Sequence, residues 1–464
     1  MNKELWNKIL AFDFDDSTSG KYGFITRLSN ENYWTRDFTE LAILEYKKFM
    51  YLISVSDTML SPSKIVDVVW HQHLIFTKSY AKFCLLLGKQ VEHIPSTHHQ
   101  EEKEIFKLAK EKTRELYTNT FGEQPPLIWN YTSMYNSLHL ETSKIKIDSL
   151  EVYGILAFII LLTPAYFLLN PIYSQINNPY FICGFIVLCI FTFIILEFYN
   201  QKVLKSTIKL SDKNSFIYNL QPSEVIYLKT QDLKSVIDVI LYKLVKNNVI
   251  VINSNKQIEL IDFEYTNSEE EEAILNLLDE FDKMYYNDVV RQLIIHPIFM
   301  TTKKSLDRLQ NYLNQSKVIS KLFFINFCIW GLLLMSSTIR LISGIIGDKP
   351  IILILITTIV LFMVIIYNLK SLINGAFTKS ICDLYEKEII PNHRVKNNIQ
   401  WNYLMEFSTL SLILYHIDRD FLEKYNYKIT TNSTDSSSCS SNDSSNDSSS
   451  SDSSCSSGCG GCGS

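Results

Sequence analysis

Residues 152–199 read VYGILAFIILLTPAYFLLNPIYSQINNPYFICGFIVLCIFTFIILEFY, and this stretch decides the fold. Val152–Leu169 runs for 18 residues without a charge, and Tyr180–Leu196 runs for another 17. Because a helix rises about 1.5 Å per residue, each run roughly matches the ~30 Å hydrocarbon core of a bilayer. The polar stretch Asn170–Pro179 contains two prolines and can serve as the turn. We therefore predict a transmembrane helical hairpin over residues 150–199.

A second apolar pair, Leu322–Ile339 and Pro350–Tyr367, flanks a short GIIGDKP loop and predicts a second transmembrane hairpin over residues 319–370. The expected fold class is mainly α. The remaining parts are a helical domain at 1–135, an α+β cytoplasmic domain at 200–318, a helical cytoplasmic segment at 371–430 and a disordered tail at 431–464.

Lysine and arginine placement predicts the orientation. These residues gather before and after each hairpin, whereas the turns carry almost none beyond Arg340 and Lys349. Since cytoplasmic loops are enriched in Lys and Arg, both turns should face outward, with both termini in the cytoplasm of a multi-pass cell-membrane protein. The net charge of −5 implies no general attraction to nucleic acid.

The N-terminal domain reads as three or four packed helices. Glu40–Ile53 is amphipathic, and Pro62 can occupy the first position of a helix behind Ser61. Apolar residues then recur at three- and four-residue steps from Ile65 to Cys84.

Six of the nine histidines lie in or just after this domain: His71, His73, His93, His98, His99 and His139. Imidazole is a common metal ligand. His71 and His73 are two residues apart, so on a helix they point in nearly opposite directions, and at most one can join His93 or Cys84. One hypothesis is a zinc site of His73, His93 and Cys84. The alternative is that His73 is a hydrogen-bonded core residue beside Trp70, and that His98 and His99 are solvated residues near a helix start.

The same region resembles a known family. Val66–Asp67 running into Trp70–His71–Gln72–His73, followed by Tyr80, Cys84, Gly88 and His93, looks like the glycine-rich domain-containing protein-like domain. The resemblance covers about residues 1–130. It implies a shared domain and brings no established activity with it.

The middle domain has the order of a winged helix. Pro222–Lys229 and Asp232–Lys246 read as helices, Val249–Asn253 and Gln257–Asp262 as a two-stranded wing, and Ala273–Tyr286 as a further helix. DNA binding would need a clear basic face on the second helix. Because aspartates at 232 and 238 offset its lysines, we expect a structural or protein-binding role.

The middle domain also resembles a domain of other proteins. Leu220–Lys229, the helix Val236–Lys246 and the following VIVI look like the central, winged-helix-like domain of a group of bacterial multi-pass membrane proteins. Those proteins end in a Cys/Gly-rich terminus, and this chain shares that layout.

Two features near the C-terminus each allow two interpretations. Trp401–Ile417 is apolar enough for a fifth span, but Glu406 near its centre favours an interfacial or buried helix. The Ser/Asp-rich tail predicts disorder. Cys459 and Cys462 have C-x-x-C spacing and, with Cys439 and Cys455, offer four thiolates to zinc; the alternative is a tail of free thiols.

No GxSxG, P-loop or HExxH pattern occurs in the sequence. The expected function is therefore a membrane-anchored scaffold or sensor, with the bilayer and an unidentified protein as partners. Two alternatives stay open: a metal-dependent membrane enzyme using the N-terminal histidines, and a membrane-tethered DNA-binding regulator.

Overall fold

The computed structural model describes residues 2–15, 22–93, 100–145, 147–173, 175–252, 257–262, 268–281, 283–392 and 401. It confirms the predicted fold class, which is mainly helical with two long apolar hairpins and a small sheet. The tail cysteines Cys459 and Cys462, and the segment Trp401–Ile417 apart from Trp401, lie outside the described residues.

The N-terminal module packs its helices around buried aromatic rings such as Phe49 and Tyr46. Its elements are α1 (Lys3–Ala11), α2 (Phe24–Asn32), α3 (Arg36–Val55), α4 (Lys64–Ile75), α5 (Thr77–Leu87), α6 (Gln100–Phe121), α7 (Pro126–Trp129) and the short 3-10 helix η1 (Met134–Leu138). Helix α4 begins behind Ser63, whose side chain accepts a hydrogen bond from the Val66 N–H. The start predicted at Pro62 is therefore shifted by two residues.

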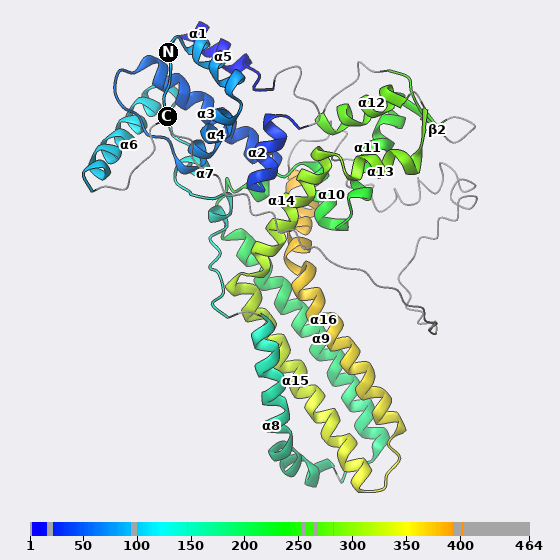
Figure 1. Cartoon of the computed structure of the whole chain (residues 1–464). Coiled ribbons are helices and arrows are strands. Elements are labelled where there is room, and N and C mark those ends of the chain that lie inside the picture. The colour runs from blue at the N-terminus through cyan, green and yellow to red at the C-terminus, as the bar shows by residue number, and fades with distance from the viewer. Residues whose placement is uncertain are drawn as a thin grey trace, which may run out of the picture. The chain divides into compact units, whose positions relative to one another are not determined.

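Among the residues that the structure describes, four helices are long and apolar enough to cross a membrane: α8 (Ile147–Tyr173), α9 (Asn178–Lys209), α15 (Lys317–Ile346) and α16 (Ile352–Leu384). They run side by side, with α15 contacting the other three (Figure 1). Trp330 of α15 is buried against Phe185 and Leu196 of α9 and Leu361 of α16. Many outward side chains, such as Ile160 and Leu168 of α8, are exposed aliphatics, as expected for a surface that faces lipid.

The middle module combines helices with a three-stranded sheet. Its elements are η2 (Phe216–Tyr218), α10 (Pro222–Thr230), α11 (Leu233–Lys246), β1 (Ile250–Ile252), β2 (Gln257–Leu260), α12 (Glu269–Phe281), β3 (Lys283–Tyr285), α13 (Tyr286–Ile294) and α14 (Pro297–Asn314). The strands are antiparallel in the order β1-β2-β3, with Ile250 opposite Leu260 and Ile258 opposite Met284.

The third strand corrects the predicted helix over Ala273–Tyr286. Helix α12 ends at Phe281, and Lys283–Tyr285 pairs with β2. Met284 is buried while its two neighbours are exposed, which is the alternation that suits a half-buried strand.

Helices α9 and α16 continue from the apolar bundle into the middle module, past the boundaries predicted at 199 and 370. Helix α16 contacts α10 and α14, then continues into a π-helical turn (Tyr385–Ile389) and the short α17 (Ile390–Asn392). The Tyr385 hydroxyl donates to the Ile217 carbonyl at 2.9 Å and accepts from the Leu220 N–H at 2.6 Å. The middle module is therefore tied to the end of a bundle helix by buried hydrogen bonds.

Arg36, the first residue of α3, joins the N-terminal module to the middle module. Its guanidinium contacts Glu269 of α12 at 2.7 Å and Glu40 of its own helix at 3.0 Å. Its backbone N–H donates to Glu224 of α10, a carboxylate that also accepts from the Gln221 N–H. One carboxylate thus accepts hydrogen bonds from backbone N–H groups at the starts of two helices that belong to different modules.

Candidate functional site

A surface cleft in the N-terminal module brings two histidines and an aspartate together. Asp67 and His71 lie one turn apart on α4, so they share a face of that helix. His93 comes from the segment after α5, which ends at Gly88 with a left-handed φ of 69° that a glycine adopts without strain. The cleft has a volume of 700 Å³.

Hydrogen bonds hold His93 over α4. The Trp70 indole N–H donates to the Tyr80 hydroxyl at 3.0 Å, and that hydroxyl donates to the Val91 carbonyl at 2.7 Å. The ring of His93 then meets the Trp70 ring edge-on, with centroids 4.6 Å apart. Buried neighbours therefore fix the position of His93.

The three side chains converge closely. His93 Nε2 lies 3.0 Å from Asp67 Oδ1, and His71 Nδ1 lies 3.6 Å from the same oxygen. One ligand atom from each residue lies within 4.8 Å of the others. Among the residues that the structure describes, no other group of three His, Cys, Asp or Glu side chains meets this spacing.

The hydrogen bonding of His71 suits a metal ligand. Its Nδ1 lies 2.8 Å from the backbone carbonyl of Asp67, a contact that places the proton on Nδ1. Nε2 then keeps its lone pair, and a fixed tautomer of this kind is typical of metal-bound histidines. The His71 side chain is 55% exposed, whereas those of Asp67 and His93 are 20% and 16% exposed. The group is therefore accessible to an ion from solvent.

Two histidines and one carboxylate form a ligand set that suits divalent transition metals. Three protein ligands leave at least one coordination position for water or another molecule. The cleft around the group has room for such a molecule, and Ser63, Lys64 and Lys89 are among its lining residues.

His73, which the zinc hypothesis makes a metal ligand, lies in the core of the module. It is fully buried, with Nδ1 2.9 Å from the Tyr46 hydroxyl and Nε2 3.2 Å from the Ser79 hydroxyl. Burial lowers the pKa of His73 to about 3, so the ring is neutral. Because both ring nitrogens have protein partners, His73 matches the alternative of a hydrogen-bonded core residue.

Cys84 is buried as a free thiol, and it is not part of the His93 group. The group with ligand spacing is Asp67, His71 and His93, so the structure brings His93 together with His71 and Asp67 and not with His73 or Cys84. Sequence reasoning missed Asp67, although its i, i+4 spacing to His71 was a usable signal. The predicted ligands Cys459 and Cys462 lie outside the described residues.

Comparison with known proteins bears on this part of the chain. Residues 26–111 match the model of a family described as UCP032817-like, so this stretch is similar to that family. The matched stretch contains Asp67, His71 and His93. No curated protein and no solved structure matches the chain.

Proposed function

We propose that this protein is a membrane-anchored sensor that binds zinc, or a divalent ion of similar chemistry, through Asp67, His71 and His93. The observation that carries the proposal is the convergence of three ligand atoms within 4.8 Å beside a surface cleft. The exposed His71 gives the ion direct access to water, which suits reversible binding.

The packing of α4 supports a sensing role. Helix α4 packs on α3, and α3 begins at Arg36, whose contacts reach Glu224 and Glu269 of the middle module. Metal binding at Asp67 and His71 therefore acts on α4, and α3 connects α4 to the Arg36 contacts that join the two modules (the junction). We place both modules in the cytoplasm on the lysine and arginine pattern, with a protein partner for the middle module.

The surface of α11 favours a protein partner over nucleic acid. Lys243 is buried and forms an ion pair with Glu271 of α12, so it is withdrawn from the surface. Asp238 is the hydrogen-bond acceptor of Tyr286 on α13. This helix thus lacks the continuous basic face that DNA contact requires.

A metal-dependent enzyme is the second candidate, because a three-ligand site keeps a position open beside a 700 Å³ cleft. Hydrolysis of ester or phosphoester probes by the zinc-loaded chain, abolished in His93→Ala, would favour it over the sensor.

Calorimetric titration with zinc tests the proposal. The full chain is purified in nanodiscs with Cys439, Cys455, Cys459 and Cys462 replaced by serine, because thiolates of the tail would also bind zinc. We expect one ion per chain, and a loss of affinity of at least about 100-fold in His71→Ala and His93→Ala. Equal affinity in these variants and their parent would refute the site.

The matched control is His139→Ala. His139 is also a half-exposed histidine beside a carboxylate, with Nε2 2.9 Å from Asp212, but its site offers no third ligand among the described residues. Its removal should leave zinc affinity unchanged.

A further inference from the structure

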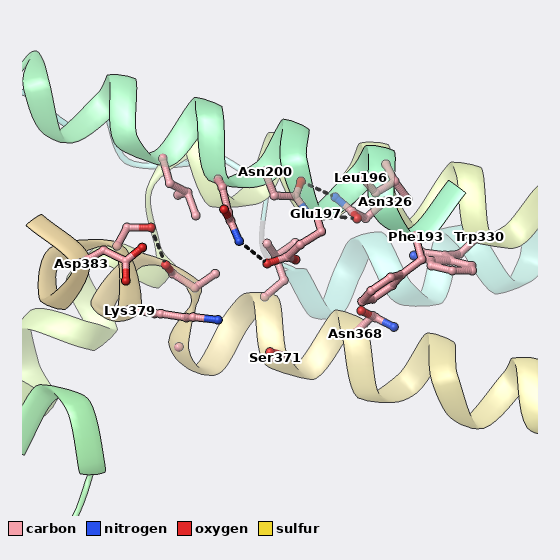
Figure 2. Close-up of a pocket in the computed structure, with 16 residues that line it drawn as sticks. Phe193, Leu196, Glu197, Asn200, Asn326, Trp330, Asn368, Ser371, Lys379 and Asp383 are labelled. Carbon is pink, nitrogen blue, oxygen red and sulfur yellow. Dashed lines mark hydrogen bonds between the residues drawn. The ribbon is translucent and has the colours of Figure 1, made fainter. Parts of the chain in front are cut away.

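A polar cavity of 210 Å³ lies between α9, α15 and α16, where the apolar bundle meets the middle module. Figure 2 shows Glu197 and Asn200 on α9, Asn326 and Trp330 on α15, and Lys379 on α16 around this space. On the α16 side the cavity is lined by Gly375, which has no side chain, and by Ala376, which has only a methyl group.

Several polar groups of the cavity have partners within the protein. Asn200 and Asn326 exchange two amide hydrogen bonds, of 3.2 and 2.9 Å. Asp383 lies 3.0 Å from Lys387 and 4.0 Å from Lys205. These groups need no ligand.

Two charges in the cavity stand apart from this network. Gln201 donates to one oxygen of Glu197 at 2.7 Å, and within the described part of the chain the other oxygen has no partner. The Lys379 ammonium likewise has no hydrogen bond or ion pair to any described residue. The cavity therefore offers one carboxylate oxygen and one ammonium that are free to bind.

The order of these charges along the bundle follows from the helices. Both α9 and α16 run from a hairpin turn toward the middle module, and the contact between Lys205 and Asp383 sets their alignment. Eight residues before Lys205 on α9 is Glu197, and eight residues before Asp383 on α16 is Gly375, so Glu197 and Gly375 lie at about the same level. Lys379 is then four residues, or about 6 Å, farther from the apolar bundle.

We propose that this cavity binds a small zwitterion, an apolar α-amino acid, with its ammonium on Glu197 and its carboxylate on Lys379. Phe193, Leu196 and Trp330 provide an apolar wall for the side chain at the bundle end. Charge-assisted hydrogen bonds to two groups of opposite sign, the half-buried Glu197 and the exposed Lys379, select a molecule that carries both charges.

The charge order argues against a phospholipid as the source of the zwitterion. In phosphatidylethanolamine the phosphate lies between the acyl chains and the ammonium, so the anion is nearer to the bilayer core. The backbone positions of Glu197 and Lys379 have the opposite order, with the acid nearer to the apolar bundle. A water-soluble zwitterion that enters from the middle-module end fits this order.

Isothermal titration of the full chain in phosphatidylcholine nanodiscs, with EDTA present, tests the proposal with L-leucine as the probe. Metal chelation makes the result independent of the zinc site. We expect saturable binding of leucine, weakened at least about tenfold in Glu197→Gln and in Lys379→Gln, since each variant removes one charge-assisted bond. Leucinamide and 4-methylpentanoate, which each lack one charge, should bind as weakly as leucine does to those variants.

Lys370→Gln is the matched control, because Lys370 is an exposed lysine of α16 outside the cavity. It should leave leucine binding unchanged. Absence of leucine binding, or equal binding of the singly charged analogues, would overturn the proposal. Displacement of leucine by phosphatidylethanolamine nanodiscs would also overturn it, since a lipid would then be the occupant.

Discussion

The backbone N–H of Arg36 donates to the carboxylate of Glu224 at 2.9 Å, joining residues 188 positions apart in the sequence. The same carboxylate accepts from Gln221 at 2.8 Å, so it closes the first turns of α3 and α10 together. Glu224 is buried, and the carboxylates of Asp37, Glu269 and Glu270 lie nearby. Arg36 is the cation that this acidic group surrounds.

Glu224 gives the junction a pH dependence. Burial raises its pKa from the ordinary 4.5 to about 7, so the folded chain holds a proton that the unfolded chain releases. Stability from this group is therefore full below pH 4.5 and is lost as the pH rises to 7. The change is at most about 3 to 4 kcal/mol, since one pKa unit corresponds to about 1.4 kcal/mol.

Thermal unfolding of the full chain at pH 5 and at pH 8 measures this effect. In Glu224→Gln the residue no longer titrates, so the drop in unfolding temperature from pH 5 to pH 8 should be smaller than in the parent chain. The comparison cancels groups that titrate in both proteins. An identical drop in the two chains would show that Glu224 is already ionised at pH 5.

Arg36→Ala should destabilise the junction by about 3 kcal/mol, because it leaves several partly buried carboxylates without their cation. Arg27→Ala is the control. Arg27 pairs with Glu31 on the surface of α2, and its loss should change the free energy of unfolding by less than about 0.5 kcal/mol. Equal effects of the two substitutions in a denaturant titration would contradict the role of Arg36.

Length and hydropathy were enough to predict the two hairpins, because an uncharged run of 17 residues has few alternatives to a bilayer. The internal ends of the apolar helices were not predictable in this way. Helix α16 continues beyond Lys370 because its C-terminal half packs on α10 and α14. The strand at Lys283–Tyr285 was missed for a related reason, since its pairing with β2 is a tertiary contact.

Helical geometry allowed at most one of His71 and His73 to join His93, and the structure places His71 beside it. The choice between them depended on the direction in which α4 faces the core, which follows from packing against α3. That packing buries His73 against Tyr46 and leaves His71 exposed.

The lysine and arginine pattern predicts the sides of the membrane. Asp348→Cys would place a thiol in the turn between α15 and α16, and Lys213→Cys one between α9 and α10. In a background without native cysteines, an impermeant maleimide should label position 348 in intact cells and position 213 after lysis. The reverse result would invert the proposed orientation.

Asn200 and Asn326 form a polar contact between α9 and α15 inside the bundle. Asn200→Leu or Asn326→Leu should each cost about 1 kcal/mol, because the remaining amide loses its partner. The double substitution should cost less than the sum, since it removes both polar groups together. Unfolding by SDS in mixed micelles measures this coupling, and strictly additive losses would rule it out. Asn368→Leu is the control, because its amide donates within α16 to the Val364 carbonyl.

His71 and His73 should respond oppositely to substitution by alanine. His73→Ala removes two buried hydrogen bonds and leaves a cavity among Phe14, Phe24 and Phe83, so unfolding should become easier by at least about 2 kcal/mol. Zinc stoichiometry of the folded chain should be unchanged. His71→Ala should abolish tight zinc binding with little change in stability, because this side chain is exposed.

Acid titration separates the two histidines further. Because burial lowers the pKa of His73 to about 3, the unfolded chain takes up a proton that the folded chain excludes below the ordinary value of 6.5. Stability from His73 is therefore present above pH 6.5 and is lost as the pH falls toward 3, opposite in sign to the contribution of Glu224. His73→Ala should remove this loss, whereas His71→Ala should keep it. If His73→Ala instead lowered zinc affinity as much as His71→Ala at a pH where both variants are folded, the division of roles between the two histidines would be wrong.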